Sequence, residues 1–190
     1  MKPISYTELP GFLSAAQIAP HYNNHYGGAL KGHLDLDKQI DVMTSCGMRN
    51  GNAYAAMQRG RTTKGNSALL HEVFFDGMTA QNSNPESNLR AAIEARFGSI
   101  KKWQDEFAAA SGSANGWAVL ALNKINGKLY NVVSDAHADG VFWQAAPIIA
   151  LDMYEHSYYL DYQNNKGAYI IKFFDYINWQ SAEKRLNEAT

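Results

Sequence analysis

Polar and apolar residues recur at helical spacing through the first half of the chain. Ser14 followed by Gln17 has the form of a capping box, so a helix is expected to begin here. The glycine pair at residues 27–28 can bend or weaken that helix. A second helix is expected over about residues 66–75, an apolar run that also contains His71. The first half is therefore predicted to be helical.

Two further helices are predicted after a polar stretch at residues 78–83. Asn84-Pro85 is typical of a helix start with proline in the first position, and an apolar stripe follows it as far as Gly98. Ser99 is suited to cap the next helix. The boundary between the two halves is therefore expected at about residues 79–86.

Short, continuous apolar runs replace this pattern in the second half. Residues 117–122 and 129–133 have the composition of strands, and Asn126-Gly127 between them is a strong hairpin signal. Residues 147–151 are expected to form a third strand, and a helical pattern returns over residues 168–186. The predicted order is helices first, then a small antiparallel sheet flanked by helices.

Composition narrows the class of protein. The 190 residues include 46% hydrophobic and 12% aromatic residues, which is typical of a packed globular chain. The net charge of −1 argues against a general electrostatic attraction to nucleic acid or membranes. The single cysteine, Cys46, excludes an internal disulfide, and no apolar run is long enough for a signal peptide or a membrane span. A cytoplasmic protein is expected.

The segment from Asp152 to His156 carries the most specific chemistry. A carboxylate and an imidazole four residues apart share one face of a helical turn, so both can reach one ion. Mixed nitrogen and oxygen ligands suit iron, manganese or zinc. Further ligands are needed, and other histidines are candidates. His21 and His25 share a helix face, and His71 lies in an apolar run, where an imidazole needs partners for both nitrogens.

One familiar zinc motif is excluded. His71-Glu72 invites comparison with H-E-x-x-H, but position 75 is Phe, so the zinc-protease interpretation is rejected. A glycine-rich phosphate loop and a G-x-S-x-G elbow are also absent from the sequence. His137, in a polar loop that precedes Asp152, remains a candidate for the same site as the other histidines.

With these residues in view, the chain resembles the iron/manganese superoxide dismutases from about residue 8 to residue 186. The most specific match is the segment DMYEHSYYLDY at residues 152–162, which is similar to the family signature D-x-[WY]-E-H-x-[YF]-[YF]. The other matching segments are residues 13–21, 69–75, 97–99, 116–118 and 178–179. The resemblance implies an α+β fold, in which an N-terminal α-helical hairpin domain, residues 1–82, precedes an α/β domain, residues 83–190, with a small three-stranded antiparallel sheet.

The resemblance also implies a metal site with two ligands from each domain. The implied ligands are His21, His71, Asp152 and His156, which would hold one Fe or Mn ion per subunit with a solvent molecule as fifth ligand. His25, in the string His25-Tyr26-Gly27-Gly28, is an alternative first ligand, because the family also has an H-Y-G-G string. Counting from Ser14 favours His21.

A homodimer, or a homotetramer built from dimers, is implied as well. Glu155 matches the family position that reaches across the dimer interface to a metal ligand, here His156 of the partner subunit. Tyr159 matches the position that hydrogen-bonds across the interface to the histidine one turn beyond the first ligand, here His25 of the partner subunit. His25 and Tyr159 are therefore expected to act around the metal, together with His137.

Two departures from the family pattern matter for catalysis. Most members have a tyrosine eight residues after the first ligand, at the substrate channel, whereas this chain has Ala29. The nearby residues that could replace it are Tyr22, Tyr26 and His33. The family glutamine that hydrogen-bonds the metal-bound solvent matches either Ser67 or His137 in this chain. Some branches of the family carry histidine at the position that matches His137. His137 is therefore assigned as the solvent-orienting residue.

The implied activity is disproportionation of superoxide to dioxygen and hydrogen peroxide by redox cycling of the ion. The alternative is a divergent family member that binds metal but has weak or no dismutase activity, and Ala29 is its main support. A metal-stabilised structural protein and a non-haem iron oxygenase are more distant alternatives. The sequence distinguishes neither iron from manganese nor dimer from tetramer, and it predicts no nucleic-acid or membrane partner.

Overall fold

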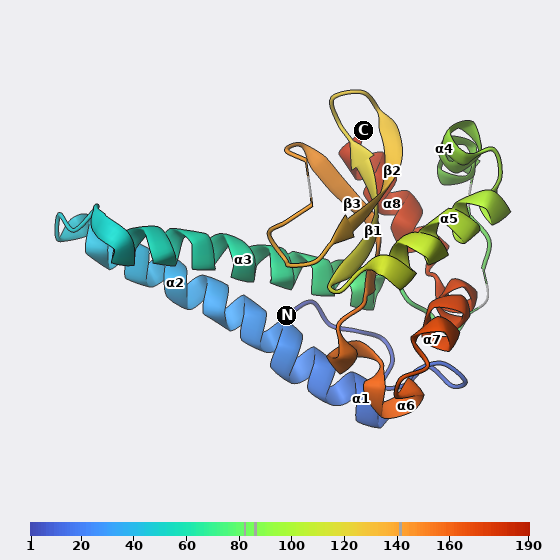
Figure 1. The fold of residues 1–190 in the computed structure, drawn as a ribbon, viewed down its shortest axis with the longest axis horizontal. Helices are drawn as coiled ribbons and strands as arrows, with labels where there is room; N and C mark the ends of the chain where they lie inside the picture. The colour runs from blue at the N-terminus through green and yellow to red at the C-terminus, as the bar shows by residue number, and fades with distance from the viewer. Residues whose placement is uncertain (82, 86, 141) are drawn as a thin grey trace.

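A helical region and an α/β region with a three-stranded antiparallel sheet make up the chain, which confirms the predicted fold class (Figure 1). The computed structural model describes residues 1–81, 83–85, 87–140 and 142–190. The helical region contains α1 (Ala15–Pro20), the π-helical turn η1 (His21–Tyr26), α2 (Gly27–Ser45) and α3 (Gly51–Asp76). The expected division between residues 82 and 83 falls on Asn82, which lies outside the described residues.

The α/β region begins with two helices, continues with the sheet and ends with short helices. Its elements are α4 (Ser87–Phe97), α5 (Ile100–Ser113), β1 (Trp117–Asn123), β2 (Lys128–Ser134), β3 (Ala145–Asp152), η2 (Glu155–Ser157), α6 (Tyr159–Tyr162), α7 (Lys166–Phe173), η3 (Phe174–Tyr176) and α8 (Trp179–Ala189). The helix cap predicted at Ser99 is confirmed, since its side chain accepts a hydrogen bond from the backbone N–H of Lys102 at 3.1 Å.

Helices α2 and α3 form a long hairpin that projects from the body of the molecule (Figure 1). The sequence pattern predicts only residues 66–75 of α3, whereas the helix has 26 residues and is about 39 Å long. Two glycines let the helices approach closely. A Cβ atom on Gly65 would lie 3.0 Å from Nδ1 of His33, and one on Gly60 would lie 3.3 Å from Leu36. This contact explains why helix-weakening residues occur in the interior of α3.

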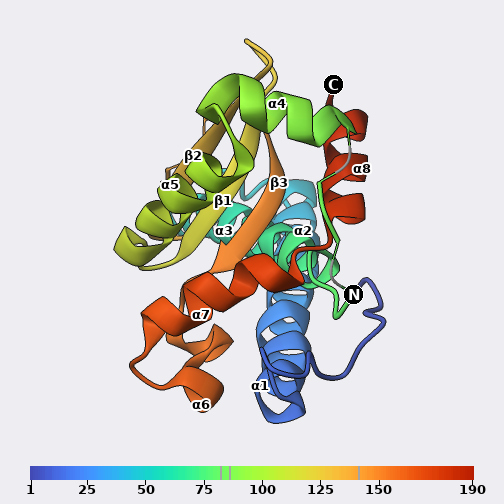
Figure 2. The ribbon, with the colours of Figure 1, turned by 90° about the vertical axis from the view of Figure 1, so that its right-hand side faces the viewer.

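The sheet has the strand order β2-β1-β3, with both pairs antiparallel. The predicted turn at Asn126-Gly127 is confirmed, and Gly127 has the positive φ of +66° that such turns require. Trp117, at the start of β1, lies opposite Ser134 on one side and Asp152 on the other. Helices α3 and α8 contact β3, while α4 and α5 contact β2 (Figure 2). The end of β3 therefore lies beside α3, inside the protein.

Two helix boundaries differ from the prediction. Helix α4 begins at Ser87, so Asn84-Pro85 precedes the helix instead of opening it. The helix predicted over residues 168–186 is divided into α7 and α8 by the short turn η3. The division is fixed by Asn178, whose side-chain oxygen accepts a hydrogen bond from the backbone N–H of Ser181 at 3.1 Å and so starts a new helix.

One apolar core joins the two regions. Phe74 of α3 and Trp117 of β1 are both fully buried, with ring centroids 6.5 Å apart. Trp103, Phe107 and Phe173 extend the same core between α5 and α7. Among the described residues, no helix is both long and apolar enough to cross a membrane. The shared core holds side chains from both regions around one buried site.

Candidate metal centre

Four side chains from four separate elements converge at one point. They are the predicted ligands His21, His71, Asp152 and His156, and one ligand atom from each lies within 4.8 Å of all the others. The Nε2 atoms of His21, His71 and His156 lie 3.1, 3.5 and 3.3 Å from the same oxygen, Oδ2 of Asp152. His21, His71 and Asp152 are buried and His156 is half-buried, so the cluster has one side closer to solvent.

The local structure around Asp152 and His156 corrects one expectation. The two residues do not share a helical turn: Asp152 ends strand β3, and His156 follows in the 3-10 turn η2. Tyr154 bridges them, because its backbone N–H donates to Oδ1 of Asp152 at 3.0 Å. This bond occupies one carboxylate oxygen and leaves Oδ2 directed at the three imidazoles. The turn therefore brings His156 to the cluster where a helix was expected to do so.

The orientation of His71 leaves a buried lone pair in the cluster. Its Nδ1 donates to the backbone carbonyl of Ser67 at 2.7 Å, so in the neutral ring Nε2 carries no hydrogen. That Nε2 is fully buried, has no hydrogen-bond partner among the described residues, and lies 3.5 Å from an acceptor oxygen of Asp152. Two acceptors facing each other in a buried site need a cation or a hydrogen-bond donor between them. A bound metal ion meets this requirement, and the fixed Nδ1–H is the usual support for a metal-binding imidazole.

The charge states of these groups suit an ion that prefers nitrogen and oxygen. Burial lowers the pKa of His71 to about 4, against the opposing attraction of Asp152. Burial also lowers the pKa of His21. Burial alone would raise the pKa of Asp152, but hydrogen bonds from His156 and His21 outweigh it and the pKa lies well below the usual range. Neutral imidazoles and an ionised carboxylate are the forms that bind iron, manganese or zinc.

Gln17 connects helix α1 to the segment that carries His156. Ser14 caps α1 as predicted, accepting from the backbone N–H of Gln17 at 3.2 Å. The side chain of Gln17 does not complete a capping box. Its Nε2 donates to the carbonyl of His156 at 2.7 Å, and its Oε1 accepts from the backbone N–H of Leu160 at 2.9 Å. A single buried amide therefore clamps the ligand segment against the helical region.

His25 and His137 flank the cluster without belonging to it. Of the two candidates for first ligand, His21 lies in the cluster. The exposed ring of His25 stacks on that of His156, with centroids 3.8 Å apart and planes at 13°. On another side, the ring of His137 lies 6.2 Å from that of His71 and accepts a hydrogen bond from Trp117 at 2.9 Å. Both histidines are near enough to influence an ion without coordinating it.

The residues suggested as replacements for the channel tyrosine make hydrogen bonds away from the cluster. Ala29 is buried. The hydroxyl of Tyr22 donates to the backbone carbonyl of Lys2, and the hydroxyl of Tyr26 accepts from the backbone N–H of the same residue. The Nδ1 atom of His33 lies 3.1 Å from the carbonyl oxygen of Arg61, between the two hairpin helices. None of these polar atoms is part of the cluster.

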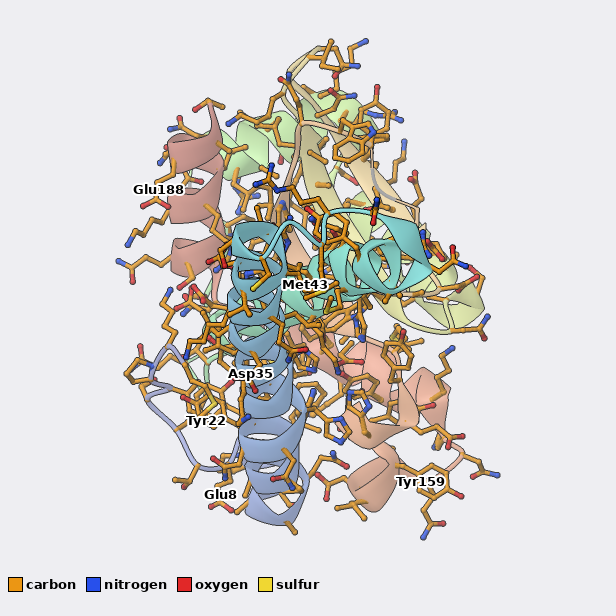
Figure 3. The ribbon with its side chains drawn as sticks, turned by 90° about the vertical axis from the view of Figure 1, so that its left-hand side faces the viewer. Glu8, Tyr22, Asp35, Met43, Tyr159 and Glu188 are labelled. Atoms are coloured by element: carbon orange, nitrogen blue, oxygen red, sulfur yellow. The ribbon has the colours of Figure 1, made fainter. Side chains whose placement is uncertain are left out.

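Two predicted interface residues lie on the outer surface beside His156. Glu155 is exposed, and the Tyr159 side chain is 47% exposed and points away from the body of the molecule (Figure 3). Leu160 next to it is 64% exposed. These side chains are therefore accessible to another protein.

Sequence reasoning missed the roles of Gln17 and Trp117. The spacing of Gln17 from Ser14 is a genuine capping-box pattern, so nothing in the sequence alone separates the clamp from a cap. Trp117 opens a predicted strand, but its place beside the cluster follows from the sheet register, which pairs it with Ser134 and Asp152.

Comparisons with known proteins show which family the chain belongs to. The family model for the C-terminal domain of iron/manganese superoxide dismutases matches residues 85–185. A manganese superoxide dismutase of Haloferax volcanii is 33% identical over 188 residues, covering 98% of this chain and 94% of the relative. An iron superoxide dismutase of Cupriavidus metallidurans is 36% identical over 196 residues, covering 100% and 96%. A manganese superoxide dismutase of Halobacterium salinarum is 33% identical, covering 98% and 93%. The chain therefore belongs to the iron/manganese superoxide dismutase family.

Proposed function

We propose that this protein is a superoxide dismutase that binds one Fe or Mn ion through His21, His71, Asp152 and His156. The observation that carries the proposal is the buried, unpartnered Nε2 of His71 facing the carboxylate of Asp152, an arrangement that a cation at that point would satisfy. Relatives named as manganese and iron enzymes, each matched over nearly the full chain, support the activity.

His21, His71, Asp152 and His156 would hold the ion, which would supply one-electron redox chemistry between its trivalent and divalent states. In the overall reaction one superoxide is oxidised to dioxygen and a second is reduced, with two protons, to hydrogen peroxide. The side chains supply the setting for that chemistry. Three neutral imidazoles and one carboxylate contribute only one negative charge, so the site retains a positive charge that attracts an anion. Fully buried Phe74, Phe75 and Trp117 restrict the space around the cluster to small molecules.

His137 and His25 are proposed to act from outside the ligand set. His137 would be the solvent-orienting residue: it would hold a hydrogen-bond donor toward solvent beside the cluster, and a bound ion would supply the acidity that makes such solvent a proton source. The stacked ring of His25 would keep His156 in its ligating orientation and limit access of bulk water on the exposed side.

We further propose that the protein is a homodimer, or a tetramer of dimers, formed through the surface around Glu155 and Tyr159. Glu155 would reach His156 of the partner subunit, and Tyr159 would reach His25 of the partner subunit. Support comes from the exposure of these side chains beside the half-buried His156. The division into domains of residues 1–82 and 83–190 and a cytoplasmic location also remain proposals.

The activity is tested by loading purified protein with Fe or Mn separately and following superoxide decay by stopped-flow spectroscopy. His71→Ala should lower the metal affinity by more than the roughly 10–100-fold caused by changes outside the ligand set. His33→Ala is the matched control, because this histidine is on the hairpin and outside the cluster. Stoichiometric metal without superoxide consumption would refute the dismutase while preserving the metal site. Failure to bind either ion would refute both.

A further inference from the structure

A small apolar cavity lies between helix α3 and the sheet, next to His137. Its volume is about 120 Å³, and its walls come from α3, from all three strands and from the loop that carries His137. Figure 1 shows α3 running along the sheet at this place. Among the described residues that line the cavity, none is one of the four proposed metal ligands. The cavity is therefore a separate space beside the metal cluster.

Small side chains at neighbouring positions of the sheet leave this space open. Ala121 of β1 is paired with Pro147 of β3, and Ala145 lies two residues before that proline. Val119 and Val132 are paired across β1 and β2 and form the wall beside Ala121, because alternate residues of a strand share one face. Protein interiors leave few voids larger than a water molecule, so an apolar space of this size is a candidate ligand site.

The wall contains polar groups that can hydrogen-bond a ligand but no charged side chain. Among the described residues that line the cavity, none is an aspartate, glutamate, lysine or arginine. The hydroxyl of Ser134 is already used, because it donates to two backbone carbonyls in the following loop. The amide of Asn66 makes no hydrogen bond with the described residues, so Asn66 and His137 can orient a ligand. A charged ligand would lose its hydration here without a partner of opposite charge.

The size of the cavity corresponds to one six-membered ring. An apolar cavity of about 150 Å³ is enough to hold benzene. The present cavity is slightly smaller, but it is partly open, since Leu69 at its edge is 48% exposed. A ring can pack against Val119 and Ala121 while one hydroxyl group reaches Asn66 or His137.

We propose that this cavity binds a small neutral aromatic alcohol of the size of phenol, and that its occupation lowers the activity of the neighbouring metal site. The ligand would contact His137, whose ring lies 6.2 Å from that of the proposed metal ligand His71. That contact would restrict the His137 ring and exclude solvent from it. The effect on activity rests on the proposed function, whereas the binding of the alcohol does not.

Binding is tested by titrating phenol into the full-length protein in a calorimeter, with the protein metal-free and loaded with Mn. The expected Kd is about 1 mM in both forms, as for other very small ligands. Benzoate, a similar ring with a negative charge, should not bind to the metal-free protein. Methyl NMR of the metal-free protein should show phenol-induced shifts at Leu70, Val119 and Val132. Binding by the Mn form alone, or shifts confined to other methyl groups, would overturn the proposal without any variant.

Ala121→Val tests the location by filling the cavity. The two added methyl groups take the place of the ring, so phenol should bind at least about tenfold more weakly. Ala118→Val is the matched control, because Ala118 is fully buried on the same strand but on the opposite face. This control should keep the Kd of phenol while its unfolding midpoint falls. An unchanged Kd in Ala121→Val would show that phenol binds elsewhere.

The effect on activity is measured by superoxide decay with the Mn-loaded enzyme at saturating phenol. The kcat/KM of the unmodified protein should fall about threefold to tenfold, less than on loss of a group that supports a metal site, and Ala121→Val should not respond. Equal inhibition of both proteins, or of neither, would overturn the effect on activity. If phenol binds in the cavity but the Fe and Mn forms do not consume superoxide, the proposed function fails and the binding site holds. If superoxide is consumed but phenol does not bind, the proposed function holds and this inference fails.

Discussion

Replacing Gln17 by Met should loosen the segment that carries His156. Methionine has nearly the same length and volume, so packing is kept while both hydrogen bonds of the amide are lost. These bonds go to the carbonyl of His156 at 2.7 Å and the N–H of Leu160 at 2.9 Å. Each lost bond leaves a partly buried backbone group unpaired, at about 1–1.5 kcal/mol, so the variant should lose about 2–3 kcal/mol. For a chain of this size that corresponds to roughly 4–12 °C in Tm.

Urea unfolding of the metal-free protein measures this loss without a contribution from ion binding. Gln180→Met is the matched control, since Gln180 is exposed on α8, and it should change stability by less than about 0.5 kcal/mol. Metal affinity of Gln17→Met should fall by about 10–100-fold, because His156 loses its anchor. If both variants have the same urea midpoint of unfolding as the unmodified protein, the hydrogen bonds of Gln17 do not stabilise the fold.

Three further predictions concern other parts of the molecule. Gly65→Ala should destabilise the protein by about 1–3 kcal/mol, because the added Cβ would lie 3.0 Å from His33. Gly112→Ala is the control: its Cβ would meet open space, so the protein should gain about 0.4–1 kcal/mol of stability. Equal effects of the two changes in denaturant titrations would contradict this. Tyr159→Ala should shift the protein from dimer to monomer in analytical ultracentrifugation, and an unchanged sedimentation coefficient would argue against the proposed interface. Lys64→Glu should lower kcat/KM about threefold to tenfold at low ionic strength, because the positive charge of Lys64 lies near His137 and would attract the superoxide anion. Lys172→Glu is the control and should leave kcat/KM unchanged; identical salt dependence of kcat/KM in both variants would rule out this effect.

The sequence predicts the parts of the fold that depend on local chemistry. The hairpin turn at Asn126-Gly127 and the cap at Ser99 are set by a few neighbouring residues, so the pattern is sufficient to find them. Residues 148–151 form a continuous apolar run, and all four are buried in strand β3. These features do not need long-range information.

The outer part of the α2–α3 hairpin was not predictable in this way. Its helices contact each other and the solvent, so α3 lacks the continuous apolar stripe that marks a helix lying on a core. Contacts at Gly60 and Gly65 become meaningful only when the opposite helix is known. Tertiary packing stabilises these helices, although their local sequence does not predict them.

The site shows the same division. His21, His71, Asp152 and His156 can be proposed from the sequence because each lies in a segment that resembles the family. The second role of Gln17 and the partner of His137 depend on which groups meet after folding. A capping position and a strand start are each consistent with many environments, and only the sheet register brings Trp117 to the histidine.

The distance along the chain between ligands has a consequence for how the protein acquires its ion. His21 and Asp152 are separated by 131 positions, yet their side chains touch. The helical region alone offers two of the four proposed ligands, His21 and His71, and lacks the carboxylate of Asp152. Coordination becomes complete only when the last strand has docked and the turn after it has emerged. The proposed site therefore exists only in the folded protein, and an ion would be bound after folding.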